Sequence, residues 1–158
     1  MSWKNQEEKK AAYDLLLMQQ EALLEGESDL ISILANSSAL LNMTLPDTVF
    51  AGYYLYKNEE LILGPFQGGV SCVHIKLGKG VCGEAAEKRQ TMIVDNVLTH
   101  KNYIACDSSA RSEIVVPIVK KDNLIGVLDI DSTEIGSYDQ MDREYLERYI
   151  ALLMKYVD

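Results

Sequence analysis

The chain has 158 residues, of which 47% are hydrophobic and 25% are charged, and its formal net charge is −9. This length and composition predict one globular domain, residues 1–158, while the negative charge argues against nucleic acid as a partner, because phosphate backbones bind clustered Lys and Arg. No stretch has the roughly 18 apolar residues of a membrane helix and the N-terminus lacks a secretory pattern, so we expect a cytoplasmic protein without a membrane partner.

The N-terminal third is predicted to be helical. Apolar residues recur at helical spacing over about 6–24, so residues 1–26 are expected to hold an N-terminal helix. Ser28 has the side chain of an N-cap for a second helix, which the turn at Pro46 ends.

The middle of the chain is rich in aromatic and β-branched residues, which favour strands. The stretch "TVFAGYYLYKNEELILGPF" has a polar break at 57–60 and predicts a hairpin. The stretch "VSCVHIKLG" predicts a third strand, in which alternation places Cys72, His74 and Lys76 on one face.

The rest of the chain predicts further strands and a closing helix. Strands are expected at "TMIVDN", "EIVVPIV" and "NLIGVLDID", and a C-terminal helix over 137–156 with a capping box that starts at Ser137. Two helices, five or six strands and a final helix predict an α+β fold. Because the strands follow one another as hairpins, the sheet should be antiparallel, with the helices on one side.

The sequence "GKGVCG", residues 78–83, resembles a dinucleotide fingerprint, but its antiparallel context and the short chain favour a tight strand-to-helix turn instead. This turn places Cys82 near a helix N-terminus, where the helix dipole favours a thiolate, although burial as a small apolar side chain is the commoner fate of a cysteine. Cys72 and His74 share a face, but no C-x-x-C occurs and His100 is isolated, so we expect no metal site.

Acidic residues in the last two strands are candidates for a binding site. Asp129 and Asp131 would point to one face of their strand together with Ile125 and Val127, where two neighbouring acids repel unless a cation lies between them. Glu113 in the preceding strand joins that face only if the connecting hairpin has an odd-numbered loop, and the sequence leaves this open.

Four stretches in order carry a family resemblance: "LGPFQGG", "SCVHIKLGKGVCGEAAEKRQ", "YIACDSSARSEIVVPIV" and "LIGVLDIDS". Together they resemble the free methionine-(R)-sulfoxide reductases, which consist of a single GAF domain. The resemblance implies a six-stranded antiparallel GAF sheet flanked by N- and C-terminal helices, usually in a homodimer, with free methionine sulfoxide as substrate. It implies no bound cofactor and a dithiol such as thioredoxin as reductant.

The same resemblance assigns roles to site residues. It implies that Cys106 is the nucleophile, that Cys72 is the resolving thiol, and that Cys82 is a helper or second resolving thiol. It also implies substrate binding by acids and by an apolar wall for the substrate's methyl group. The residues at these positions are Glu113, Asp129 and Asp131 for the acids, and Phe50 and Tyr53 for the wall.

The chemistry suits these residue types. A cysteine thiolate can attack the sulfoxide sulfur while an acid, for which Glu113 is the candidate, protonates the oxygen. The substrate's ammonium would give the clustered carboxylates a partner. Two alternatives remain open, a GAF sensor that binds a small molecule and a thiol redox switch without a substrate.

Overall fold

The computed structural model describes residues 2–157. The helices are α1 (Gln6–Leu24), α2 (Leu30–Thr44), α3 (Gly80–Lys88), a short 3-10 helix (Val97–Thr99) and α4 (Gln140–Met154). The strands are β1 (Thr48–Lys57), β2 (Glu60–Gly68), β3 (His74–Lys76), β4 (Met92–Val94), β5 (Ser112–Lys120) and β6 (Asn123–Ser132). None of the helices within these described residues is long and apolar enough to span a bilayer.

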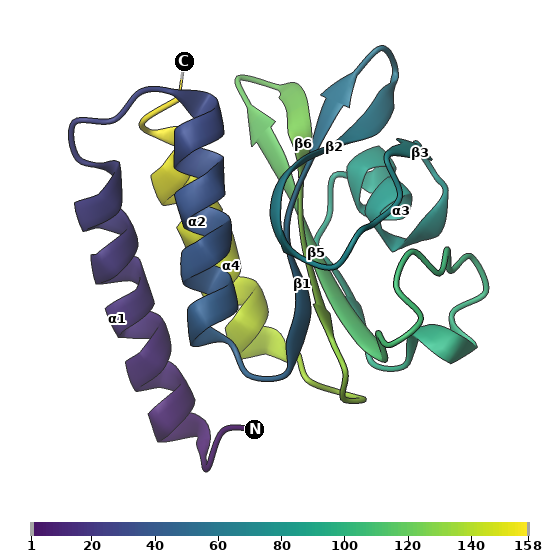
Figure 1. Cartoon of the computed structure of the whole chain (residues 1–158), viewed down its shortest axis with the longest axis horizontal. Coiled ribbons are helices and arrows are strands. Elements are labelled where there is room, and N and C mark those ends of the chain that lie inside the picture. Colours follow the sequence, from purple (N-terminus) through teal and green to yellow (C-terminus); the bar gives the residue numbers. More distant parts are fainter. Residues whose placement is uncertain (1, 158) are drawn as a thin grey trace.

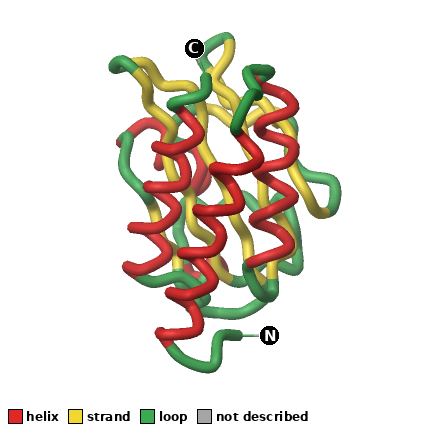
Figure 2. The backbone as a smooth tube through the Cα atoms, turned by 90° about the vertical axis from the view of Figure 1, so that its left-hand side faces the viewer, coloured by secondary structure: helices red, strands yellow, loops and turns green. Residues whose placement is uncertain are grey.

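One antiparallel sheet with the strand order β3-β2-β1-β6-β5-β4 forms the centre of the molecule. Helices α2 and α4 lie on one face, and α1 packs against both of them, farther from the sheet (Figures 1 and 2). The α+β class, the six antiparallel strands and the flanking terminal helices are therefore confirmed. The expectation that all helices lie on one side is wrong, because α3 covers the opposite face.

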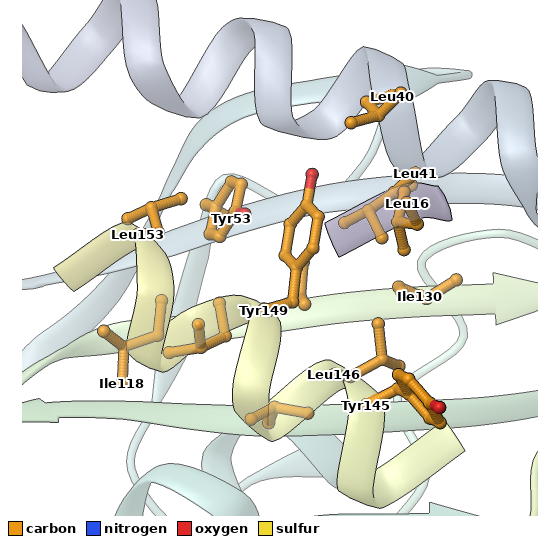
Figure 3. Close-up of a cluster of buried hydrophobic side chains, with 14 of the residues drawn as sticks. Leu16, Leu40, Leu41, Tyr53, Ile118, Ile130, Tyr145, Leu146, Tyr149 and Leu153 are labelled. Carbon is orange, nitrogen blue, oxygen red and sulfur yellow. The ribbon is translucent and has the colours of Figure 1, made fainter. Parts of the chain in front are cut away.

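The larger hydrophobic core lies between the sheet and the three long helices (Figure 3). Leu146, Tyr149 and Leu153 of α4 are fully buried there against β-strand residues such as Ile118 and Ile130. A second core lies beneath α3 and is the floor of the candidate site described below. The sheet is therefore covered on both faces, and its central strands β1, β6 and β5 are the rigid support of that site.

The N-caps of two helices lie one and two residues later than predicted. The N-cap of α2 is Asp29, not Ser28, and its carboxylate accepts a hydrogen bond from the backbone N–H of Ser32. The capping box of α4 pairs Asp139 with Asp142, so the helix predicted over 137–156 begins at Gln140. In both cases a carboxylate is the cap, which adds a favourable interaction with the helix dipole to the hydrogen bond.

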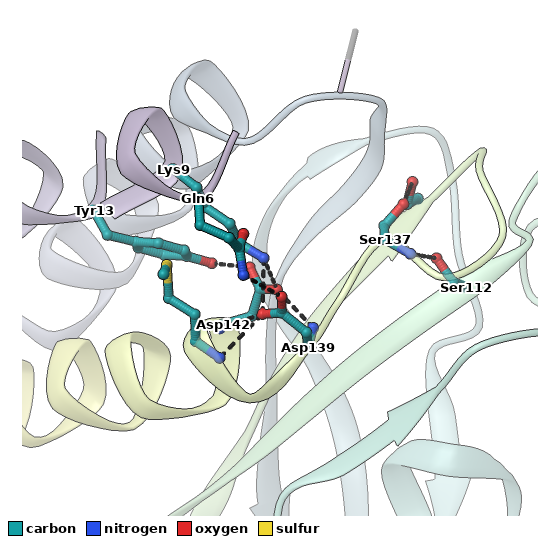
Figure 4. A network of polar contacts seen from close by, with 9 residues as sticks. Gln6, Lys9, Tyr13, Ser112, Ser137, Asp139 and Asp142 are labelled. Carbon is teal, nitrogen blue, oxygen red and sulfur yellow. Dashed lines mark hydrogen bonds and ion pairs between the residues drawn. The ribbon is translucent and has the colours of Figure 1, made fainter. Parts of the chain in front are cut away.

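A buried ionic network fastens α1 to the start of α4 (Figure 4). The ammonium of Lys9 contacts Asp142 Oδ2 at 2.5 Å and Asp139 Oδ1 at 2.9 Å. The hydroxyl of Tyr13 donates to Asp142 Oδ1, and the Gln6 side-chain amide donates to Asp139. Lys9 and Asp142 are 3% and 1% exposed, so each compensates the charge that the other carries into the core.

We expect Lys9→Met to lower the free energy of unfolding by about 3 kcal/mol, because the buried Asp142 carboxylate would lose its cation. Urea denaturation measures this change. Lys10→Met is the matched control, since Lys10 is exposed and pairs only with the exposed Asp14 on the surface of the same helix. A Lys9→Met midpoint equal to that of Lys10→Met would contradict the prediction.

The hairpin of β5 and β6 contains a bulge that decides which side chains face the site. Its turn has two residues, Lys121 and Asp122, both with positive φ, as in the usual tight hairpin turn. Near the turn Val119 lies opposite Leu124, but the next pair is Ile118 with Gly126. Ile125 is therefore an extra residue in β6 that has no partner in β5.

The bulge reverses the side-chain direction on the turn side of β6. Ile125 packs into the helix-side core and Leu124 into the core beneath α3, the opposite of the predicted faces. Beyond the bulge, Glu113 lies opposite Asp131, and opposed residues in an antiparallel pair share a face. The two-residue turn alone would have sent Glu113 to the other face, and the extra residue restores it.

Candidate active site

A cavity of about 30 Å³ lies between the sheet and α3. Its wall comes from β1, β5, β6, α3 and the loop of residues 100–111, which we call the Cys106 loop. The functional side chains on this wall are Tyr54, Cys82, Tyr103, Cys106, Glu113, Asp129 and Asp131. The structure thus brings together two of the three cysteines and all three acids that the sequence analysis singled out.

Glu113, Asp129 and Asp131, the carboxyl cluster, form the polar floor of the cavity. Glu113 and Asp129 are 6% and 5% exposed, and Asp131 is partly buried. Burial, followed by repulsion from a neighbouring acid of the cluster, raises the pKa of each carboxyl well above its usual range. The cluster therefore holds protons at pH values at which ordinary surface carboxyls are ionised.

The carboxyl cluster has no ion-pair partner among residues 2–157, although Lys79 lies elsewhere in the cavity wall. Within the same residues, Asp129 Oδ1 is buried and has no hydrogen-bond partner. A buried acceptor without a donor costs free energy, so the cluster is built to receive a donor or a cation from outside.

Cys72 and Cys106 form a disulfide at the mouth of the cavity, with a Cα–Cα distance of 5.3 Å. Cys72 was expected inside a strand, but β3 begins only at His74, and Cys72 lies in the segment before it. The hydroxyl of Tyr54 donates to the Cys72 carbonyl oxygen at 2.9 Å and so fixes this segment to β1. The disulfide in turn holds the Cys106 loop over the cavity.

Cys82 is the free cysteine among the described residues. It lies in the first turn of α3 as predicted, with Sγ 3.9 Å from Glu113 Oε2. Of the two alternatives considered for Cys82, a thiolate and a buried small side chain, the structure shows burial, with 5% of the residue exposed. Burial, followed by repulsion from Asp129 and Glu113, raises the pKa of the Cys82 thiol and so disfavours the thiolate.

Neither residue predicted for the aromatic wall lines the cavity, although Phe50 lies on the same side of the sheet. Phe50 is buried on the α3 side of the sheet, where its ring stacks on Phe66 and Tyr54 at centroid distances of 5.1 and 6.2 Å. Tyr53 points to the opposite face, into the helix-side core, where its hydroxyl bonds with Ser37 Oγ (Figure 3). Strand alternation pairs Phe50 with Tyr54, a signal that was present in the sequence.

The residues considered for a metal in the sequence do not form a site. His74 is exposed and pairs with Glu60 at 3.1 Å, while the Cys72 sulfur is in the disulfide. A different group has ligand atoms that lie within 4.8 Å of one another: Cys82, Glu113 and Asp129. These residues come from three elements that are far apart in the sequence, so no local spacing could reveal them.

Comparisons with known proteins find similar sequences and structures over most of the chain. A family model described as a GAF domain matches residues 29–154. The chain is 46% identical over 134 residues to the free methionine-R-sulfoxide reductase of Escherichia coli, covering 85% of this chain and 81% of that protein. It is 49% identical to fRMsr of Staphylococcus aureus in complex with substrate, with a TM-score of 0.87 and coverage of 91% and 94%.

A third similar protein is the free methionine-R-sulfoxide reductase of Neisseria meningitidis, whose X-ray structure is also a complex with its substrate. It is 39% identical to this chain, with a TM-score of 0.91, and the match covers 99% of this chain and 92% of that one. The similarity therefore extends over almost the whole chain, including α1, which lies before the matched GAF region.

Proposed function

Since the chain belongs to the GAF-domain family of free methionine-R-sulfoxide reductases, we propose that it reduces free L-methionine-(R)-sulfoxide to L-methionine, with residues 1–158 acting as one domain. The observation that carries this proposal is that Cys106 of the Cys72–Cys106 disulfide lines one cavity with a carboxyl cluster that forms no ion pair within residues 2–157. A redox-active cysteine pair and a site for a cationic group thus share one cavity.

In the first step, Cys106 acts as the nucleophile. Its thiolate attacks the sulfoxide sulfur, and a carboxylic acid protonates the oxygen. The sulfoxide oxygen ends on the Cys106 sulfur as a sulfenic acid, and methionine leaves with its sulfur reduced by two electrons. Glu113 of β5 is the proton donor in this proposal, because burial and the neighbouring Asp129 raise its pKa and so favour the protonated form.

In the second step, the Cys72 thiol condenses with the sulfenic acid, which forms the disulfide and releases water. Cys82 stays free in this state and serves as a helper or second resolving thiol. An external dithiol of the thioredoxin class then reopens the disulfide by exchange, so no bound cofactor is required. We place this cycle in the cytoplasm, as the sequence predicts, and in a homodimer, as the family resemblance implies.

The substrate binds with its ammonium on the carboxyl cluster and its methyl group against aromatic rings. Asp129 and Asp131 supply acceptors for the ammonium. Asp129 Oδ1 is free to accept, because it has no hydrogen-bond donor among residues 2–157. Phe50 and Tyr54 lie on the α3 side of the sheet, so they replace Phe50 and Tyr53 as the apolar wall. The wall remains aromatic, which suits a methyl group.

The disulfide form is closed to substrate. A cavity of about 30 Å³ has room for about one water molecule, and methionine sulfoxide is several times larger. Reduction of the Cys72–Cys106 disulfide frees the Cys106 loop from the segment before β3. Opening of this loop therefore follows reduction, and the oxidised enzyme binds substrate only after its reductant has acted.

The sensor and switch alternatives predict different behaviour. A sensor needs no disulfide at the mouth of its ligand cavity, and a redox switch without substrate needs no cluster of buried acids. The structure has both features within one cavity. Their combination favours an enzyme whose substrate carries an ammonium group.

We expect the purified protein with a thioredoxin system to consume NADPH when free L-methionine-(R)-sulfoxide is added. The S epimer should give less than about 1% of that rate. With its ammonium in the same place, its oxygen would face the aromatic wall and its methyl group would face the proton donor. Equal rates with both epimers would contradict the proposed placement. Tight methionine binding without turnover of either epimer would support the sensor.

A further inference from the structure

Three possible metal ligands meet in the cavity from different elements. The Cys82 sulfur comes from α3, a carboxylate oxygen of Glu113 from β5 and one of Asp129 from β6, all within 4.8 Å of one another. Donors of a tetrahedral zinc ion are about 3.3–3.8 Å apart, as follows from metal–ligand distances of about 2.0–2.3 Å. The separation of 3.9 Å between Cys82 Sγ and Glu113 Oε2 is close to that value.

An independent observation points to a missing positive partner at the same place. Asp129 is 5% exposed, lines the cavity, and its Oδ1 atom accepts no hydrogen bond from residues 2–157. Within the same residues, the hydroxyl of Tyr138 and Gln20 Nε2 are also buried without a partner, but neither residue lines the cavity. Asp129 Oδ1 is the atom of this set that belongs to the cavity wall.

The size and chemistry of the cavity select the kind of ligand. In the closed state about 30 Å³ accommodates a single ion or water but no amino acid. A thiol among the ligands favours zinc-class ions over magnesium and calcium, which prefer oxygen donors only.

We propose that this cavity binds one Zn²⁺ ion through Cys82 Sγ and one carboxylate oxygen each of Glu113 and Asp129. On binding, the thiol gives up its proton to solvent, as does each carboxyl that is protonated, and a sulfur–zinc bond forms without change of oxidation state. A water molecule completes the four ligands. Asp131 lies next to this group in the carboxyl cluster and adds negative charge.

The ion would keep the substrate out. This consequence rests on the proposed function, in which the substrate's ammonium and the proton donated by Glu113 use the same carboxyl groups. Zn²⁺ should therefore raise the apparent KM for methionine sulfoxide, and substrate should weaken metal binding by a matching factor.

Cobalt titration of the variant Cys72→Ser/Cys106→Ser tests the site directly. Its only thiol is Cys82, and its Cys106 loop is not held by a disulfide, so an ion can enter. We expect one equivalent of Co²⁺ to produce a thiolate-to-cobalt charge-transfer band, and Zn²⁺ to remove the band by displacement. Adding Cys82→Ser should abolish the band, and adding Asp129→Asn should weaken binding by roughly tenfold or more.

His74→Gln in the same double variant is the matched control, because it removes the exposed pair with Glu60 and should leave the band unchanged. Circular dichroism checks that each variant is folded. No band in the double variant, or a band that survives Cys82→Ser, would overturn the proposal. Metal binding that persists while methionine sulfoxide fails to compete would leave the zinc site standing and contradict the proposed position of the substrate.

Discussion

Cys106→Ser is expected to abolish methionine sulfoxide reduction, with a loss of at least roughly 10³-fold in kcat/KM, because a hydroxyl is a far weaker nucleophile than a thiolate. The thioredoxin-coupled consumption of NADPH measures this loss. Substrate binding should persist, since the carboxyl cluster and the aromatic wall are unchanged. Calorimetry measures whether the variant still binds methionine. Retained binding shows that the protein is folded and that only the chemistry has been lost.

Cys72→Ser is the matched control for the loss of Cys106. It keeps the nucleophile but removes the thiol that lies in the disulfide, so each enzyme molecule should still produce about one methionine before it stops as the sulfenic acid. Quenched-flow measurement of methionine gives this stoichiometry. If Cys72→Ser cycles normally with thioredoxin, Cys82 is the main resolving thiol and the assignment of Cys72 is wrong.

Glu113→Gln is expected to reduce kcat by roughly 10²–10⁴-fold, the usual contribution of a positioned acid catalyst. The amide keeps the shape of the side chain but cannot donate a proton to the sulfoxide oxygen. Because burial and Asp129 raise the Glu113 pKa, the protonated donor form persists to higher pH than in an ordinary glutamate. Wild-type kcat should therefore fall as pH rises through that raised pKa.

The pH profile distinguishes proton donation from substrate binding by Glu113. The alkaline fall in kcat should be absent from the residual activity of Glu113→Gln. Glu60→Gln, which changes an acid outside the cavity, should behave like wild type. A Glu113→Gln enzyme with unchanged kcat and only a raised KM would show that Glu113 binds substrate and is not the acid.

The elements of the fold could be predicted because each has a strong local pattern. The helix of residues 6–24 is long and amphipathic, and the hairpin of β1 and β2 turns at Asn58 and Glu59 inside the predicted break at 57–60. The position of α3 was not predictable in this way. Its nine residues bury Val81, Ala85 and Ala86 against the side of the sheet opposite the long helices. The local sequence pattern of α3 does not indicate which side of the sheet it covers.

The candidate site required information of three kinds. The pairing of Cys72 with Cys106 was implied by the family resemblance, since a separation of 34 residues carries no local signal. The position of Tyr54 could have been read from strand alternation, which excludes Tyr53 from the site. The raised pKa of the Cys82 thiol could not be predicted from the sequence. It depends on burial and on acids of β5 and β6 that only the folded chain brings near.

The face taken by Glu113 depended on a non-local feature. Counting residues from the two-residue turn gives the wrong face, and the bulged Ile125 corrects it. Nothing about an isoleucine between Leu124 and Gly126 marks it as the extra residue. The bulge becomes visible only in the pairing of β5 with β6, after both strands are placed in the sheet.

The bulge at Ile125 also determines which changes in this hairpin preserve the carboxyl cluster. Regular pairing from the two-residue turn, with Ile125 included in the ladder, would place Glu113 opposite Ile130, on the face of the long helices. Deleting Ile125 removes only the extra residue, so Glu113 would stay opposite Asp131. The cluster therefore tolerates the loss of this residue but not its entry into the ladder, although the turn itself is exposed and does not line the cavity.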